Sequence, residues 1–276
     1  MSVIIIPEIR FKKDMLNYHK TWRFINSKPC SASCNMALDE AIAVSVRKGD
    51  SPPTLRLYSW DKPSLSLGRF QKSSDINIEY CRANRIQIVK RPTGGRAILH
   101  GDELTYSFSV RTDHEPFSKG LLDSYKKISA VFNLALNKLG IQAESKKHRE
   151  KGRVLAGSPL CFQSSSFGEI LIDNKKVIGS AQKRWSDGLL QQGSIPYIID
   201  EPATVKVFRL KPSQDIKESM TGLKDIIPDL SDKEFRGIIK RSFEEIFDIK
   251  FIPALPSQNE EALARELEAE KYQVFE

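Results

Sequence analysis

The sequence lacks any apolar run of the roughly 18–20 residues that a membrane-spanning helix requires. The apolar stretch Val3–Ile6 is followed directly by Pro7 and Glu8, which makes it too short for the core of a signal peptide. Internal repeats and low-complexity linkers are also absent. We therefore expect a cytoplasmic protein with no membrane partner, and 276 residues suit one large domain or one domain with a small appendage.

Cysteine is scarce: the chain has only 4, too few for a disulfide framework at this length. Cys30 and Cys34 have a C-x3-C spacing, but no second cysteine or histidine pair accompanies them, so we expect no metal site. The stretch GRVLAGS (152–158) resembles the start of a phosphate-binding P-loop. It lacks the required lysine and follows a charged segment rather than a strand, which excludes that interpretation.

Positive charge is in excess, with a net charge of +8 and a sequence pI near 9.2. The lysines and arginines are spread along the whole chain, and no zinc-finger, RNP-type or helix-turn-helix pattern accompanies them, so we expect no nucleic-acid partner. Two explanations stay open at this point: a solvated basic surface, or a surface that attracts an acidic protein.

Hydrophobic patterning predicts strands and helices in mixed order. Strands with alternating or β-branched residues are predicted at 54–60, 86–93, 103–112 and 189–199, and a hairpin at 167–185 with its turn at Asp173 and Asn174. Helices are predicted at 35–49, capped by Asn35 and ended by Gly49, and at 121–140, 232–247 and 259–271. On the third of these, Phe235, Ile238, Ile239, Phe243 and Ile246 share one face. The pattern indicates a mainly antiparallel sheet flanked by helices, which is an α+β fold.

The stretch KRPTGGRAILHG (90–101) is the first with chemical content. Paired glycines after a strand allow positive φ and a close approach of the backbone to a ligand. Arg91 and Arg96 bracket them and could hold a carboxylate or a phosphate. A hairpin corner with two solvated arginines explains the same residues equally well.

Cys161 is the candidate nucleophile. A single cysteine is more often a small buried apolar residue, but this one lies between a glycine-containing polar loop and QSSS, and lysines follow in the adjoining hairpin. A nearby ammonium group would favour the thiolate. Histidine could assist only through the fold, from His100 or His148. Strand alternation sends Lys175 and Lys176 to opposite faces, so at most one of them shares a pocket with Cys161.

The chain resembles the lipoate–protein ligase A/octanoyltransferase family over roughly residues 22–200. The motifs NMALDEAI, LRLYSWDKPSLSLGRFQ, RPTGGRAILHGDELTYS, CFQSSSFGEI and KKVIGSAQKR…LLQQGSI occur in the family's order. The resemblance implies the biotin/lipoate protein ligase fold, which is related to class II aminoacyl-tRNA synthetases. We expect one catalytic domain at 1–250 and a helical tail at 251–276.

Two chemistries occur in this family. Ligases use ATP and Mg²⁺ to make a lipoyl-adenylate. The cysteine-dependent, ligase-like octanoyltransferases need no cofactor, and SPLCFQSSSFGEI together with the short tail is similar to these. The resemblance then implies octanoyl transfer from acyl carrier protein, through a thioester on Cys161, to the lysine of a lipoyl domain such as glycine cleavage H protein. Such partners are acidic, which gives the net positive charge a role in steering.

The resemblance also implies roles for individual residues. Lys176, in the K-x-x-G-S-A segment, would hold the acyl carbonyl and move protons to the leaving thiol. The acyl slot would be lined by Arg91, Thr93, Gly94, Gly95, Arg96, His100, Gly179, Ser180 and Ala181. The chain departs from the family pattern at Gln192, where relatives commonly have histidine before the glycine, and the Cys161 segment lacks the usual proline and tyrosine.

Overall fold

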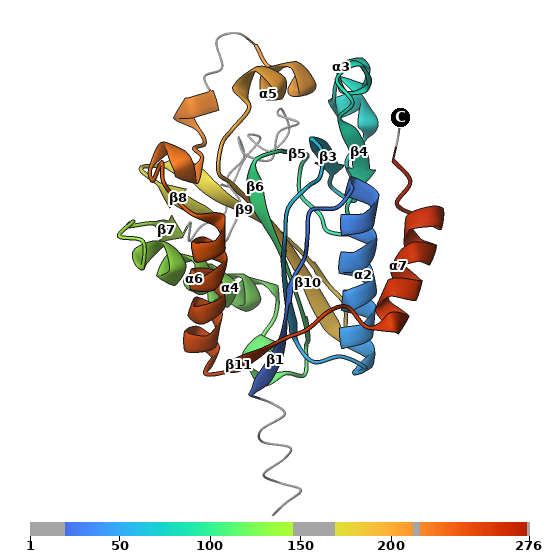
Figure 1. Ribbon diagram of the computed structural model, residues 1–276, viewed down its shortest axis with the longest axis vertical. Coiled ribbons are helices and arrows are strands. Elements are labelled where there is room, and N and C mark those ends of the chain that lie inside the picture. The colour runs from blue at the N-terminus through green and yellow to red at the C-terminus, as the bar shows by residue number, and fades with distance from the viewer. Residues whose placement is uncertain (1–19, 146–168, 212–215, 275–276) are drawn as a thin grey trace, which may run out of the picture.

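The structure is a computed structural model that describes residues 20–145, 169–211 and 216–274 (Figure 1). An eight-stranded sheet of order β11-β1-β2-β6-β10-β9-β8-β7 stands beside a three-stranded sheet of order β4-β3-β5. The strands are β1 (Thr21–Asn26), β2 (Thr54–Tyr58), β3 (Ser64–Leu67), β4 (Gln87–Lys90), β5 (Ile98–His100), β6 (Glu103–Arg111), β7 (Glu144–Ser145), β8 (Ile170–Ile172), β9 (Lys175–Arg184), β10 (Gly188–Pro196) and β11 (Lys250–Pro253). The helices are α2 (Ala32–Lys48), α3 (Ile78–Ala83), α4 (Leu121–Asn137), α5 (Glu201–Phe208), α6 (Asp232–Phe247) and α7 (Gln258–Glu270).

The large sheet is the centre of the molecule because helices cover both of its faces. Figure 1 shows α4 and α6 on one side of the strands and α2 with α7 on the other. The two central strands are buried almost throughout, β6 from Glu103 to Val110 and β10 along its whole length. Aromatic residues such as Trp22, Phe108 and Phe243 fill the side under α4 and α6. The large sheet is thus a two-sided scaffold that fixes the side chains of β6, β9 and β10.

The small sheet joins the large one through a short connection. β5 ends at His100, and β6 begins at Glu103. On its outer side the small sheet packs Leu65, Leu67 and Ile88 against residues of α3 and α5, which forms a second hydrophobic core. The space between the two sheets therefore lies beside residues 100–103 and beside the neighbouring strand β10.

The sequence predictions of fold class and of most elements are confirmed. Antiparallel pairing joins β2, β6, β10, β9, β8 and β7, whereas β1 pairs in parallel with β2 and with β11. The hairpin turn lies at Asp173 and Asn174, both with positive φ. Helix α6 has the predicted bounds, but Ile246 is 40% exposed and does not share the buried face of the helix. The short strands β1, β3, β5 and β11 escaped prediction from the sequence.

The predicted N-cap of the first long helix was wrong. Helix α2 begins at Ala32, and the Ser31 side chain accepts the capping hydrogen bond from the Cys34 amide. Asn35 lies inside the helix and is buried, where its side-chain amide donates to the carbonyls of Cys30 and Ser59. Gly49 ends the helix with φ of +83°, as predicted.

Cys30 and Cys34 form a disulfide bond across this helix start, which the cysteine count did not lead us to expect. Cys81 is a buried free thiol in the core beneath the small sheet. Within 20–145, 169–211 and 216–274, no group of three or more His, Cys, Asp or Glu side chains is placed to hold a metal ion.

The C-terminal segment packs on the main body. β11 pairs with β1, and α7 lies against α2 (Figure 1). Arg23 of β1 donates two hydrogen bonds to Glu260 of α7, at 2.8 and 2.5 Å, and both side chains are nearly inaccessible to solvent. The expected domain boundary at residue 250 stays a prediction.

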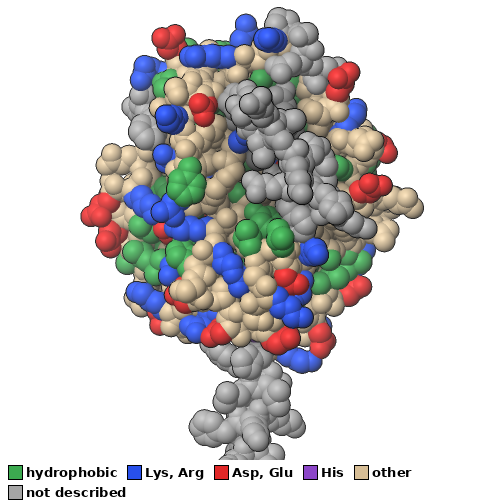
Figure 2. Space-filling model, turned by 180° about the vertical axis from the view of Figure 1, so that it is seen from behind, with side chains coloured by type: hydrophobic (Ala, Val, Ile, Leu, Met, Phe, Trp, Pro, Cys, Tyr) green, Lys and Arg blue, Asp and Glu red, His purple; other side chains and the backbone are tan. Residues whose placement is uncertain are grey.

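No helix in the described part of the chain is long and apolar enough to span a bilayer. Figure 2 shows Lys and Arg side chains distributed over the rear face, with Asp and Glu side chains among them.

The buried Arg23–Glu260 pair makes the attachment of α7 sensitive to acid. Burial alone would raise the pKa of Glu260, but hydrogen bonds from Arg23, the Ser257 amide and Ser51, with the Arg23 charge, lower it below its ordinary 4.5. A lowered pKa stabilises the folded state above pH 4.5, and this contribution is lost as the pH falls through the pKa of the folded state.

We expect Glu260→Gln to lower the free energy of unfolding at pH 7 by about 2–3 kcal/mol. Its deficit relative to the unmodified protein should shrink below pH 4, in urea unfolding followed by circular dichroism. Glu261→Gln, at the exposed neighbouring position, is the matched control and should change stability by less than about 0.5 kcal/mol. Equal effects of the two substitutions would contradict this assignment.

Candidate active site

The glycine loop that follows β4, residues 91–96, is folded around its own arginine. Arg91 is 4% exposed, and its guanidinium donates to the carbonyl oxygens of Ser66, Gly94 and Arg96 at 2.9, 2.7 and 2.7 Å. These bonds hold the loop, so Arg91 shapes the site from within. In Arg96, by contrast, Nη1 is buried and has no hydrogen-bond partner among the described residues.

Two glycines permit this loop to lie close to its neighbours. Gly95 has φ of +86°, and a Cβ there would lie 2.9 Å from Nη2 of Arg91 and 3.7 Å from the Cβ of Ala181. Gly68, just after β3, lies so close that a Cβ would come within 1.8 Å of the Gly95 carbonyl oxygen. The loop therefore packs directly between the end of β3 and the surface of β9.

A narrow slot lies between the glycine loop, α2 and the large sheet. Its open volume is about 20 Å³. The residues that line it come from α2, the two sheets and their connections: Met36, Tyr58, Trp60, Ser66, Arg91, Ile98, His100, Thr105, Ser180, Ala181, Gln192, Gly193 and Ser194. The lining is largely apolar, which suits an aliphatic chain once flexible side chains such as Met36 move aside.

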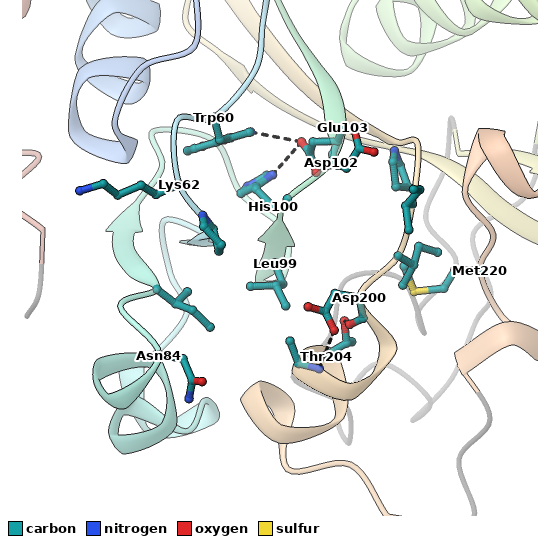
Figure 3. A pocket seen from close by; sticks show the side chains of 18 of the residues that line it. Trp60, Lys62, Asn84, Leu99, His100, Asp102, Glu103, Asp200, Thr204 and Met220 are labelled. Atoms are coloured by element: carbon teal, nitrogen blue, oxygen red, sulfur yellow. Dashed lines mark hydrogen bonds and ion pairs between the residues drawn. The ribbon is translucent and has the colours of Figure 1, made fainter. Parts of the chain in front are cut away.

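A larger cavity of about 540 Å³ adjoins the slot (Figure 3). Trp60, His100 and Ser194 line both spaces, and the rings of Trp60 and His100 stack with centroids 4.0 Å apart. Figure 3 shows the Trp60, His100 and Glu103 side chains together at one end of the cavity, away from Asn84 and Thr204. The Trp60–His100 stack is thus part of the wall between the two spaces.

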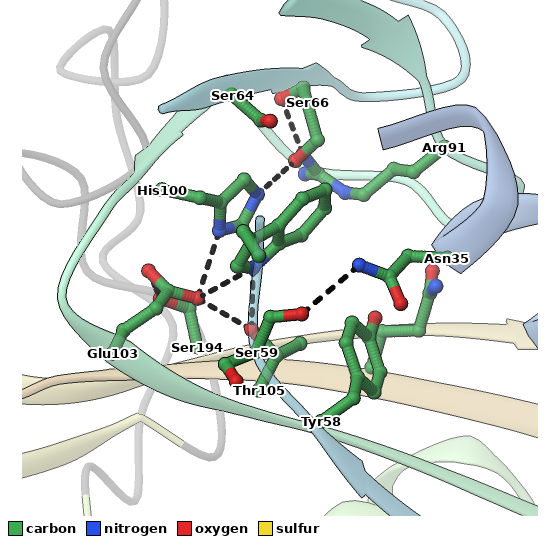
Figure 4. Close-up of polar contacts among 12 residues, drawn as sticks. Asn35, Tyr58, Ser59, Ser64, Ser66, Arg91, His100, Glu103, Thr105 and Ser194 are labelled. Atoms are coloured by element: carbon green, nitrogen blue, oxygen red, sulfur yellow. Dashed lines mark hydrogen bonds and ion pairs between the residues drawn. The ribbon is translucent and has the colours of Figure 1, made fainter. Parts of the chain in front are cut away.

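Glu103 fixes this wall through a buried hydrogen-bond network (Figure 4). Its Oε1 accepts from Trp60 Nε1 at 3.2 Å and lies 2.9 Å from His100 Nδ1, and its Oε2 accepts from Ser194 at 2.9 Å. His100 Nε2 lies 2.7 Å from the Ser66 hydroxyl. Both ring nitrogens of His100 are therefore occupied, and a pairing with Cys161 would have to displace one of these partners.

Lys176 lies on β9 and is only 2% exposed. Its Nζ donates to Oε1 of Glu169, which is equally buried, at 2.5 Å. Lys175 is partly exposed, so the two lysines differ in environment as strand alternation predicts. The ammonium is held by a carboxylate that sequence reasoning did not single out.

Four of the nine residues predicted to line the slot are among its lining residues. Arg91, His100, Ser180 and Ala181 line the slot directly, and Gly179 pairs with Ser194 on β10. Cys161 and His148 lie outside the described residues, so their roles stay predictions.

Sequence reasoning missed the polar residues beneath the slot. Asp39, on α2, is fully buried and accepts hydrogen bonds from Arg56, Ser107, Tyr58 and Gln192 at 2.7, 2.6, 2.9 and 2.7 Å. Burial, and next the Asp39 charge, raise the pKa of Tyr58 well above its ordinary value, so the phenol keeps its proton and donates it. The sequence signal was a carboxylate close to apolar residues such as Met36 and Ala43 in the same helix, which marks a buried, paired charge.

These features define an α+β protein with a narrow, largely apolar slot and with a buried lysine on β9, one of the strands that line the slot. Residues 31–244 match the family described as the Lipoyl protein ligase A/B catalytic domain. The chain belongs to this family, as its motifs led us to expect.

Curated relatives cover nearly the whole chain. The octanoyltransferase LipM of Carboxydothermus hydrogenoformans is 37% identical over 266 residues, which is 93% of this chain and 98% of the relative. The octanoyltransferase LipM of Halalkalibacterium halodurans is 36% identical over 273 residues, with the same shares covered.

Solved structures share the fold. A lipoate-protein ligase A bound with ATP superimposes with a TM-score of 0.77 at 25% identity, covering 91% of this chain and 95% of that one. The bi-partite lipoate protein ligase of Thermoplasma acidophilum gives a TM-score of 0.74 at 24% identity over 92% and 94% of the two chains, which supports the fold.

The contact between Gly68 and the glycine loop predicts a large difference between two glycine substitutions. Gly68→Ala places a methyl group against the Gly95 carbonyl and should lower the free energy of unfolding by about 1–3 kcal/mol. At Gly94 a Cβ would have nothing within 4 Å, so Gly94→Ala should leave stability within about 0.5 kcal/mol of the unmodified protein. Urea unfolding measures the free energy of unfolding of both variants. A Gly68→Ala protein as stable as the Gly94→Ala protein would contradict the close packing of Gly68 against the glycine loop.

Proposed function

We propose that this protein is an acyltransferase that moves octanoyl groups onto a lysine of lipoyl-domain proteins, through a thioester on Cys161. The observation that carries the proposal is the agreement with curated octanoyltransferases over 93% of this chain and 98% of the relative. The apolar slot beside the glycine loop supports it, because an eight-carbon chain needs a lining of this character.

The chemistry requires no cofactor. The Cys161 thiolate attacks the thioester carbonyl of octanoyl-acyl carrier protein, the new carbon–sulfur bond forms, and the carrier thiolate leaves and takes up a proton. The neutral amine of the acceptor lysine then attacks the octanoyl-Cys161 carbonyl. An amide forms, the bond to Cys161 breaks, and the amine proton passes to the departing thiolate. Exchange between thioesters is nearly isoenergetic and amide formation is downhill, so ATP is not consumed.

Lys176 is proposed to stabilise the oxygen of the acyl carbonyl. Its ammonium is desolvated and oriented by Glu169, so a hydrogen bond to a developing oxyanion would be strong there. The Glu169 carboxylate also gives the Lys176 side chain, which is otherwise removed from water, a hydrogen-bonded partner of opposite charge.

The proposed donor is acyl carrier protein, and the proposed acceptors are lipoyl domains such as glycine cleavage H protein. Both kinds of partner are acidic, and the net charge of +8 would attract them.

The direct test mixes the purified protein with octanoyl-acyl carrier protein in the absence of nucleotide. Intact-protein mass spectrometry should detect one octanoyl group that hydroxylamine removes. Cys161→Ala should lower transfer by about a thousandfold or more, whereas Cys81→Ala, which removes the buried thiol elsewhere, should still load. Loading only with free lipoate, ATP and Mg²⁺ would support a ligase instead.

A second prediction concerns the buried lysine. Lys176→Met should lower the rate of octanoyl loading by about a hundredfold, because it removes the donor proposed for the carbonyl oxygen. Lys175→Met, at the adjacent and partly exposed position, is the matched control and should load at close to the normal rate. Single-turnover mass spectrometry measures both rates. A Lys176→Met protein that loads as fast as Lys175→Met would exclude this role for Lys176.

A further inference from the structure

The Gln192 side chain on β10 bridges the buried Asp39 carboxylate and the glycine loop. Its Nε2 donates to Oδ2 of Asp39 at 2.7 Å, and its Oε1 accepts from the Thr93 hydroxyl at 2.9 Å. All three side chains are buried, with Asp39 and Thr93 at 0% exposure and Gln192 at 5%. A continuous hydrogen-bonded path therefore runs from α2 across β10 to the loop.

The chemistry of the neighbours fixes the orientation of the Gln192 amide. The Asp39 carboxylate also accepts from Arg56, Ser107 and Tyr58, and the Arg56 guanidinium is buried beside it as the counter-charge. An ionised carboxylate only accepts hydrogen bonds, so the NH₂ group of the amide must face Asp39. The amide carbonyl consequently faces Thr93, whose hydroxyl supplies the donor.

Thr93 attaches the glycine loop to β10 through its side chain, whereas Arg91 attaches the loop to Ser66 of β3. Arg91 binds the carbonyls of Gly94 and Arg96, and the Arg69 amide donates to the carbonyl of Thr93 at 2.9 Å. Gly94 and Gly95 carry no side chain that could anchor the loop to the sheet. Among the described residues, the Thr93–Gln192 bond links the loop through a side chain to β10, whose residues Gln192, Gly193 and Ser194 line the slot.

We propose that Gln192 is a positioning residue for the acyl slot, acting through Thr93 to hold the glycine loop in place against β10. The identification of the slot's ligand as an acyl chain rests on the proposed function. The bridge from Asp39 to Thr93 rests on the two hydrogen bonds alone, whatever ligand the slot takes. A glutamine does here what a neutral histidine could also do, because an imidazole has one donor for Asp39 and one acceptor for Thr93.

A residue that merely filled space would behave differently. Gln192→Leu keeps the side-chain volume but removes both the donor and the acceptor, which leaves the buried Thr93 hydroxyl unpaired. Thr93→Val removes the same bond from the other side while the bond between Gln192 and Asp39 remains. Two substitutions on different elements should therefore disturb one loop in the same way.

The experiment compares Gln192→Leu, Thr93→Val, the double variant and Gln192→His by two measurements. Hydrogen–deuterium exchange of the peptide covering residues 91–97 reports on the loop without any substrate. Steady-state kinetics with octanoyl-acyl carrier protein and an apo lipoyl domain separate KM for the donor from kcat. Peptides from β6 serve as the internal control for global unfolding.

We expect Gln192→Leu and Thr93→Val each to speed exchange in the loop about tenfold or more, with β6 unchanged. Each should lower kcat/KM for the donor about tenfold or more through a raised KM, and the double variant should be no worse than the more impaired single variant. Gln192→His should recover most of the kcat/KM that Gln192→Leu loses, because it restores a donor and an acceptor.

Unchanged loop exchange in both single variants would overturn the inference, and so would additive effects in the double variant. An unmodified protein that never loads octanoate would instead defeat the proposed function, and the exchange measurement would still decide whether Gln192 holds the loop.

Discussion

The Asp39 carboxylate is the interaction around which the slot is arranged. It is fully buried, and four donors from β2, β6 and β10 converge on it. An unpaired carboxylate in this place would be strongly destabilising, so each donor is held in one orientation. Through Arg56 the anion fixes β2 against α2, and through Gln192 it reaches the glycine loop. The polar residues beneath the slot thus have few other arrangements, whereas apolar lining side chains such as Met36 can move.

Glu103 is the buried carboxylate that holds the wall between the slot and the larger cavity. It gathers Trp60, His100, Thr105 and Ser194 from both sheets, so the wall between the slot and the larger cavity is held by hydrogen bonds as well as by ring stacking. Both carboxylates act as acceptors for neighbouring residues. The group proposed to act on the substrate is Lys176, which has its own carboxylate partner in Glu169. Asp39 and Glu103 thus hold the walls of the site, and a third carboxylate, Glu169, orients the lysine that is proposed to act on the substrate.

Much of this arrangement could be predicted from the sequence, for identifiable reasons. Long amphipathic segments such as 232–247 and the Asp173–Asn174 turn carry local signals, and the structure has them where those signals lie. Family motifs directed attention to Arg91, Ala181 and Lys176. Short strands such as β3 carry too little periodicity to be seen. Asn35 was misassigned because its side chain caps no helix but bonds to the carbonyls of Cys30 and Ser59, contacts that exist only in the folded chain. Arg91 had the residue type of an anion ligand, and only the structure reveals that its donors hold the loop.

In the proposed reaction the acyl group is bound covalently to this protein after it leaves the donor and before it reaches the acceptor. A chase experiment tests this intermediate most directly. The protein is loaded from octanoyl-acyl carrier protein, freed of the donor and of any nucleotide, and mixed with an apo lipoyl domain, while mass spectrometry follows both proteins. We expect the octanoyl group to leave this protein and to arrive on the lipoyl-domain lysine at the rate of steady-state turnover. An octanoyl group that stays in place, or that transfers only when ATP is added, would contradict the account.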